Sequence, residues 1–96
     1  MHYDVAGDDR STAVRVCQIV FGRTRPTSDP ERPTRQVAGF IHRPGVVWVG
    51  QSVLVLPPRD AEELALRLRR LRVRVSMARV PIGGDTLEAF RRRGVC

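Results

Sequence analysis

The stretch from Asp60 to Leu71, DAEELALRLRRL, carries the pattern that most restricts how this chain can fold. Its apolar residues recur at helical spacing and form one continuous stripe, whereas charged residues fill the opposite side of the helix. The stripe consists of Ala61, Leu64, Ala65, Leu68 and Leu71. Asp60 and Glu63 have the spacing of a capping box, which predicts that the helix begins here. A helix with one apolar side packs that side against another layer, and we expect the layer to be a sheet.

The residues that follow this helix predict a strand and then a second helix. Residues 72–78, RVRVSMA, alternate strictly, so that Arg72 and Arg74 face away from the intervening valines. Asp85 begins another segment with capping-box spacing, which predicts a short C-terminal helix.

Two short apolar runs precede the amphipathic helix, and they flank Gly50-Gln51-Ser52 in the stretch GVVWVGQSVLVLP, residues 45–57. Glycine and serine are favourable where a strand bends or bulges. The pattern therefore predicts two short strands that meet at this interruption. Pro57 and Pro58 end the second strand.

The first apolar block, AVRVCQIVF at residues 13–21, is compatible with two structures. Its β-branched residues favour a strand, and near-continuous apolar runs are typical of strands buried on both faces. Positions 13, 16, 17, 20 and 21 also fit one face of a helix. We favour the strand, which makes residues 1–12 a flexible N-terminal segment and residues 13–96 a single domain.

Residues 22–33, GRTRPTSDPERP, contain three prolines and predict a mobile loop. In residues 34–43, Thr34 has the chemistry of a helix cap, which favours a short helix. A strand over 36–42 is the alternative. The predicted order is strand, loop, helix, two strands, helix, strand and helix. Apart from the last helix, this is the split βαβ or ferredoxin-like order, an α+β fold whose antiparallel sheet carries two helices on one face.

The chain has a formal charge of +7, and all of its seventeen basic residues are arginine. The absence of lysine and asparagine is simply explained by a GC-rich genome, which weakens any argument from arginine content alone. A positive net charge nevertheless attracts polyanions in a salt-dependent way. We expect a basic ridge that contacts phosphates. It comprises Arg67, Arg70, Arg72, Arg74, Arg91 and Arg92.

No apolar run reaches the length of a membrane span, and the acidic beginning of the chain is unlike a secretory signal. A cytoplasmic protein without membrane partners is expected. Cys17 and Cys96 are too far apart for zinc-ligand spacing. We expect Cys17 to be a small buried residue and leave the role of Cys96 open.

Residues 33–57, PTRQVAGFIHRPGVVWVGQSVLVLP, followed by a capped helix, carry a family resemblance. The stretch resembles the amino-terminal domain of chromate-resistance regulatory proteins and, more broadly, the small CRISPR-associated spacer-acquisition nuclease family. Gln51, Ser52 and Val53 stand where those proteins have a similar segment leading into a strand. The resemblance implies a ferredoxin-like domain that dimerises through its sheet, and we expect Trp48 and Gln51 at the dimer interface. Stacking of Trp48 on a base is the alternative role.

The resemblance also implies binding of duplex DNA and, in some members, metal-dependent nuclease activity that uses an Asp at the end of the first strand. No Asp lies there if residues 13–21 are that strand. A second alignment matches Tyr3-Asp4 to the family's tyrosine–aspartate signature. It makes residues 1–5 the first strand and 11–21 the first helix, with Gly22 as its cap, and it leaves 23–44 as an insertion. Asp4 would then be catalytic, and Asp4 and Asp8 would bind Mg²⁺ or Mn²⁺.

The sequence thus favours a homodimeric nucleic-acid-binding protein, without catalytic activity or cofactor, that binds duplex DNA. A metal-dependent endonuclease that uses Asp4 and a protein-interaction module that pairs through its sheet remain the alternatives.

Overall fold

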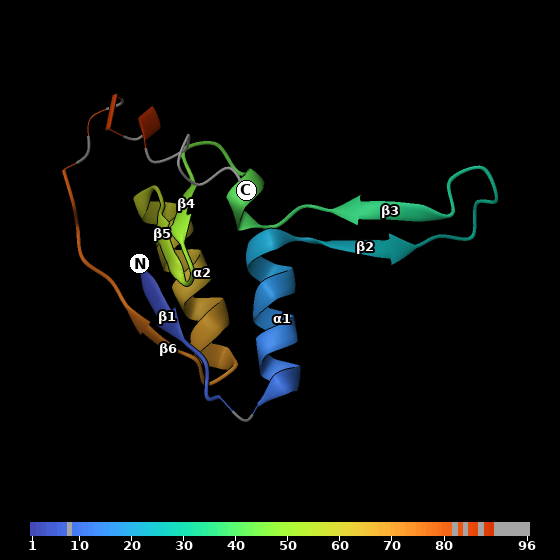
Figure 1. Ribbon diagram of the computed structural model, residues 1–96, viewed down its shortest axis with the longest axis horizontal. Helices are drawn as coiled ribbons and strands as arrows, with labels where there is room; N and C mark the ends of the chain where they lie inside the picture. Colours follow the sequence, from blue (N-terminus) through green and yellow to red (C-terminus); the bar gives the residue numbers. More distant parts are fainter. Residues whose placement is uncertain (8, 82, 84, 87, 90–96) are drawn as a thin grey trace.

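The computed structural model describes residues 1–7, 9–81, 83, 85, 86, 88 and 89, and has a mixed α+β architecture (Figure 1). A four-stranded antiparallel sheet is packed with two helices. The strands of this sheet are β1 (His2–Asp4), β4 (Val47–Gly50), β5 (Val53–Val55) and β6 (Arg74–Ser76). The helices are α1 (Arg10–Phe21) and α2 (Pro58–Arg70).

The strand order in this sheet is β4-β5-β1-β6, and each neighbouring pair is antiparallel. The interruption at Gly50-Gln51-Ser52 joins β4 to β5, as predicted: Gly50 ends β4, and Gln51 and Ser52 form the turn. The register shifts between Trp48 and Gly50, and Gln51 adopts a positive φ of 45° in the turn. The polar residues therefore reverse the chain between two neighbouring strands.

The expectation of a strand at residues 13–21 was wrong, because these residues belong to α1. Asp9 caps the beginning of the helix, and Gly22, with φ 88°, follows its last residue. Val16 and Val20 are buried, whereas Cys17 is exposed, so the expected burial of Cys17 was also wrong. The density of β-branched residues indicated a strand buried on both faces, whereas these residues form a helix that buries only one side of its surface.

The first residues of the chain, expected to be flexible, include a strand in the interior of the sheet. β1 pairs with both β5 and β6, and Tyr3 is only 7% exposed. The amino group of Met1 donates a hydrogen bond to the carbonyl oxygen of Leu54 at 2.7 Å. Three residues are too few to show strand periodicity in the sequence, so this strand was found only through the second alignment.

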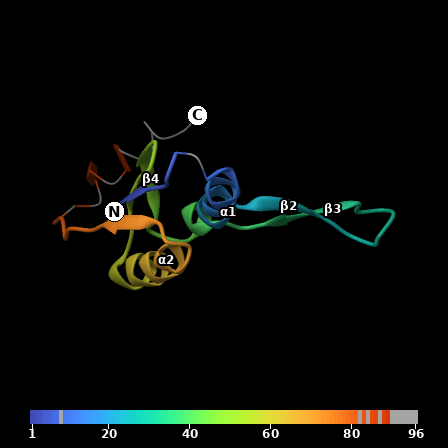
Figure 2. The same ribbon diagram turned by 90° about the horizontal axis from the view of Figure 1, so that it is seen from below.

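Residues 22–43 form a projecting hairpin and a single helical turn. The hairpin consists of β2 (Arg23–Pro26) and β3 (Thr34–Val37), and the turn is η1 (Phe40–His42). The predicted helix over 34–43 was therefore wrong, and the predicted loop at 22–33 is a strand in its first part. The hairpin extends away from the rest of the molecule in both views, along the longest dimension of a chain measuring 47 × 32 × 24 Å (Figures 1 and 2).

The apolar stripe of α2 is confirmed, because Leu64, Ala65 and Leu68 are buried. Pro57 takes the cap position in place of Asp60, whose carboxylate contacts Arg43 instead. Both helices pack into one core with the sheet and η1. The core consists of Tyr3, Val16, Val20, Phe40, Val46, Leu54, Leu64, Leu68 and Val73.

The predicted alternation after α2 is confirmed from Val73 to Ser76. Val73 is buried and Val75 is half-buried on the side of the helices, whereas Arg74 and Ser76 are exposed. The strand is shorter than the predicted 72–78, and Met77 is 44% exposed. Among the described residues, no helix has both the length and the apolar character that crossing a membrane requires. The expected C-terminal helix from Asp85, including Arg91 and Arg92, falls largely outside the described residues.

Candidate nucleic-acid interface

The side of the sheet that the helices leave uncovered, here called the helix-free face, presents charged and polar side chains. Its exposed residues are His2, Asp4, Val53, Arg74 and Ser76. Asp4 and Arg74 stand directly opposite each other on β1 and β6. Cross-strand neighbours of this kind have their Cβ atoms about 5 Å apart, so the carboxylate and the guanidinium share one small area of the face.

Arg72 occupies an unusual backbone conformation in the turn between α2 and β6. Its φ is 61°, in the left-handed region that favours glycine. The amide of Arg72 donates to the carbonyl oxygen of Arg69 at 2.9 Å, and the amide of Val73 donates to that of Leu68 at 3.1 Å. This is the Schellman pattern at a helix end, and glycine is its usual residue at this position. The chain thus places an arginine where the backbone favours a residue without a side chain.

Arg70 and Arg72 border a hollow of about 420 Å³ beside the beginning of α1. Asp9, on the same hollow, accepts hydrogen bonds from the amide and the hydroxyl of Thr12 at 3.0 and 2.7 Å. The bond from the Thr12 amide is the main cause that lowers the pKa of the Asp9 carboxyl below its ordinary value. Asp9 therefore serves as a helix cap and is engaged by its own helix.

The ridge of arginines predicted from the sequence is divided by the structure. Arg70 and Arg72 lie at the hollow, and Arg74 lies on the helix-free face. Arg67 is directed toward η1, where its guanidinium carbon lies 5.5 Å from the centre of the Phe40 ring. Arg91 and Arg92 lie outside the described residues.

The predicted catalytic and metal-binding carboxylates are only partly placed. Asp4 is exposed at the end of β1, which is the position that the second alignment requires. Asp8 lies outside the described residues. In the described part of the chain, no three His, Cys, Asp or Glu side chains are grouped in a way that would hold a metal ion.

Trp48 and Gln51, predicted at a dimer interface, contact each other within one chain. The Nε1 of Trp48 donates to the carbonyl oxygen of Gln51 at 2.9 Å. The Trp48 ring meets the Phe21 ring edge-on, with centroids 5.7 Å apart. Trp48 is half-buried and Gln51 is exposed, so the turn between β4 and β5 is held by the indole, and its role in dimerisation stays a prediction.

The chain matches no family model, no curated protein and no solved structure. The proposed function below is therefore based on the geometry of the chain's own side chains.

Sequence reasoning missed an ion-pair cluster that ties η1 to α2. The guanidinium of Arg43 contacts Asp60 at 3.0 Å and binds Glu63 through two hydrogen bonds of 3.0 and 2.9 Å. These bonds, first among the causes, hold the pKa of the Glu63 carboxyl below its ordinary value. Arg43 also lies 3.9 Å from the centre of the Phe40 ring. The partners are 17 and 20 residues apart in the chain, and no local pattern in the sequence relates them.

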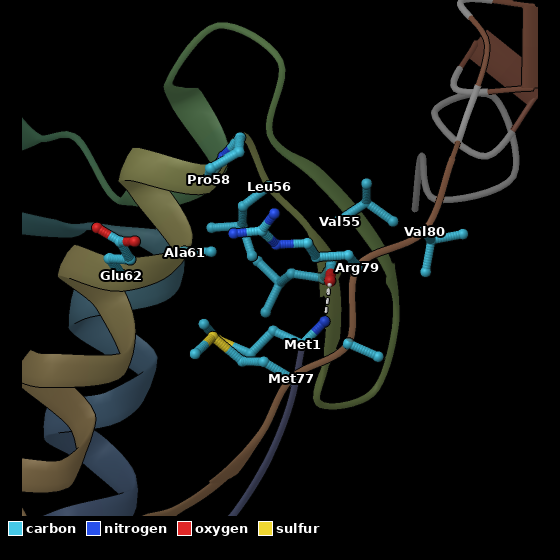
Figure 3. Close-up of a pocket in the computed structure, with 11 residues that line it drawn as sticks. Met1, Val55, Leu56, Pro58, Ala61, Glu62, Met77, Arg79 and Val80 are labelled. Atoms are coloured by element: carbon cyan, nitrogen blue, oxygen red, sulfur yellow. Dashed lines mark hydrogen bonds between the residues drawn. The ribbon is translucent and has the colours of Figure 1, made fainter.

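Sequence reasoning also missed an apolar groove of about 590 Å³ between β5, the beginning of α2 and the segment after β6 (Figure 3). Met1, Leu56 and Met77 line it, and Glu62 and Arg79 supply its charged groups. None of the predicted catalytic, metal-binding, dimer-interface or phosphate-binding residues lines it. The arginines around the turn after α2 therefore remain the candidate interface.

Proposed function

We propose that this chain is a ferredoxin-like, homodimeric protein that binds duplex DNA without cleaving it. The order β1-α1-β4-β5-α2-β6, with the sheet order β4-β5-β1-β6, is compatible with a split βαβ domain interrupted by the β2–β3 hairpin. A ferredoxin-like domain is also what the resemblance of residues 33–57 implies.

The observation that carries the proposal is the position of Arg72. A non-glycine residue in the left-handed region costs about 1–2 kcal/mol. Arg72 is exposed and, in the described part of the chain, forms no ion pair. Because the guanidinium of Arg72 is not engaged in an ion pair within the described part of the chain, it is available to bind a phosphate of another molecule. Arg70 borders the same hollow as Arg72, and Arg74 is exposed on the adjoining helix-free face, so the three guanidinium groups are available to phosphates at the turn after α2.

Binding of a fluorescently labelled duplex, followed by anisotropy, tests this proposal. We expect Arg72→Glu/Arg74→Glu to weaken binding at least about 100-fold, because two phosphate contacts are lost and replaced by repulsion. Arg15→Glu/Arg59→Glu is the matched control, since it changes the net charge equally at exposed positions on α1 and at the beginning of α2. Equal losses of duplex affinity in both double variants would mean that net charge alone explains the effect, and would count against a specific site at Arg72 and Arg74.

A metal-dependent endonuclease is the second candidate, and the position of Asp4 favours it. Asp4 is the last residue of β1 and is exposed on the helix-free face. In the resembling family, each subunit of a dimer contributes one such Asp to the metal. One chain lacks a cluster of carboxylates in its described part, so a second subunit would have to complete the site.

Incubation of duplex DNA and RNA with Mg²⁺ or Mn²⁺ separates the two candidates. Cleavage by the wild type that Asp4→Asn abolishes, with duplex affinity retained, would support the nuclease. Intact substrates with both proteins, together with tight binding, would support the binding protein.

A further inference from the structure

The β2–β3 hairpin, with its connection at residues 27–33, forms an arm that projects from the body of the molecule (Figures 1 and 2). Every residue of its two strands is exposed except Val37, which is half-buried. An isolated two-stranded ribbon without an apolar face is marginally stable in water. We therefore expect the arm to become more stable when it contacts a binding partner.

The register of the arm separates its side chains by charge. On one face, Arg25 stands directly opposite Arg35, and Arg23 stands opposite Val37. On the other face, all of the side chains are uncharged. They are Thr24, Pro26, Thr34 and Gln36. The arm thus has one arginine face and one neutral face.

The positive charges on the arginine face lie close together and are not neutralised within the described part of the chain. Like charges directly opposite each other on neighbouring strands destabilise a ribbon. In the described part of the chain, neither Arg25 nor Arg35 forms an ion pair, and Arg23 forms none either. An anion placed over this face would neutralise the repulsion and occupy the guanidinium donors.

The arm has defined geometry in spite of its exposure. The amide of Thr27 donates to the carbonyl oxygen of Pro33 at 3.0 Å, and the amide of Glu31 donates to the Asp29 carboxylate at 2.9 Å. On the neutral face, the Gln36 side chain donates to the Thr24 hydroxyl at 3.0 Å. These bonds fix the register that places Arg25 beside Arg35.

The chemistry of the arm favours nucleic acid over other anionic partners. A membrane-binding element would carry large apolar residues at its tip, whereas the tip at residues 27–33, TSDPERP, has none. A protein interface would bury aromatic or large aliphatic side chains, and residues 23–36 contain no Phe, Tyr, Trp, Leu, Ile, Val or Met. Arg23 and Arg25, two residues apart on one strand, are separated by about 6.6 Å, which suits a repeating row of charges such as a phosphodiester backbone.

We propose that the arginine face of the β2–β3 arm lies along the phosphate backbone of a nucleic-acid duplex and extends the binding footprint beyond the turn after α2. The inference rests on the proposed function for the nature of the ligand, but it uses different residues. Each strand of the arm has four residues and reaches about 13 Å, which corresponds to roughly four base pairs.

The test compares two double variants that lower the net charge by the same amount on opposite faces of the arm. Arg25→Gln/Arg35→Gln changes the arginine face, and Thr24→Glu/Thr34→Glu changes the neutral face. Affinity is measured on duplexes of about 12 and about 30 base pairs, in DNA and in RNA, over a range of salt concentrations. Thermal unfolding of both variants checks that the body of the molecule remains folded.

We expect Arg25→Gln/Arg35→Gln to weaken binding of the long duplex about ten-fold or more and to reduce the salt slope by about two. Its affinity for the short duplex should fall by a smaller factor, because a short duplex offers fewer phosphates to the arm once the turn after α2 is occupied. Thr24→Glu/Thr34→Glu should keep the wild-type salt slope on both duplexes.

Two results would overturn the role of the arm while leaving the proposed function intact. One is an unchanged affinity and salt slope on the long duplex in Arg25→Gln/Arg35→Gln, with binding still sensitive to Arg72→Glu/Arg74→Glu. The other is equal weakening by both arm variants, which would reduce the effect to net charge. Failure of the wild type to bind any duplex would instead remove the proposed function and this inference together. Binding to phosphatidylserine vesicles that Arg25→Gln/Arg35→Gln abolishes, without duplex binding, would likewise overturn the assignment to nucleic acid.

Discussion

Gly22 and Gly39 lie against each other at the base of the β2–β3 arm, where the chain leaves and re-enters the body of the molecule. A Cβ atom on Gly22 would lie 2.5 Å from the carbonyl oxygen of Val37 and 2.9 Å from the amide nitrogen of Gly39. A Cβ atom on Gly39 would collide with the amide nitrogen of Gly22. The two strands of the arm can converge here only because neither residue has a side chain.

Gly39→Ala should therefore destabilise the protein by about 2–3 kcal/mol, since backbone atoms on both sides of the contact would have to move. Chemical denaturation measures the effect. Gly50→Ala is the matched control, because a Cβ at Gly50 has no atom within 4 Å, and it should cost less than about 1 kcal/mol. Similar losses in the two variants would contradict the close approach at the base of the arm.

Arg72→Gly should increase stability and weaken duplex binding at the same time. Glycine relieves the left-handed strain at φ 61° and should raise the free energy of unfolding by about 1 kcal/mol. The loss of the guanidinium should reduce duplex affinity and the salt slope by about one. A variant that is less stable than the wild type, or that binds as tightly, would show that the arginine is kept for a structural reason.

Leu64→Ala should cost about 2–5 kcal/mol, because Leu64 is fully buried between α2 and the sheet. Leu66→Ala tests the direction of the helix, since Leu66 is 53% exposed two residues away. It should change the free energy of unfolding by less than about 0.5 kcal/mol. Comparable losses at the two positions would mean that α2 is rotated from the orientation described here.

Glu63→Gln should remove part of the acid sensitivity of folding. The pKa of Glu63 lies below its ordinary value of 4.5 because Arg43 binds its carboxylate. A lowered folded-state pKa stabilises the fold above pH 4.5, and this contribution disappears as the pH falls through the folded pKa. The effect should be small and screened by salt, since both side chains are partly exposed.

The measurement is the unfolding midpoint at low ionic strength between about pH 3 and pH 7. Glu62→Gln, one residue away and exposed, should retain the wild-type profile. A Glu63→Gln profile that coincides with the wild type would show that the Arg43–Glu63 ion pair does not contribute to stability.

The parts of the fold that the sequence predicted are those with a complete local pattern. The stripe of α2 and the alternation around Val75 each extend over enough residues to define a buried side. The turn at Gln51 was predictable because it interrupts two apolar runs. The alternation placed Arg74 correctly on β6, whereas Arg72, expected in the same strand, lies in the turn between α2 and β6.

The parts that the sequence did not predict depend on tertiary contacts. Val16 and Val20 belong to a helix that the β-branched composition concealed, and Tyr3 belongs to a strand of only three residues. The arm was concealed by its prolines, which lie at the end of β2 and in the connection, whereas residues 34–37, TRQV, have ordinary strand composition. The left-handed backbone of Arg72 could not be read from the sequence, since glycine is the residue that would have indicated it.

The salt dependence of duplex binding by the wild-type protein tests the central claim most directly. Affinity for a duplex of about 30 base pairs is measured by anisotropy between about 50 and 200 mM salt. The account predicts binding that weakens with a log–log slope of about −3 or steeper, because several arginines displace counterions from phosphates. Undetectable binding at 50 mM salt, or a slope close to zero, would contradict it.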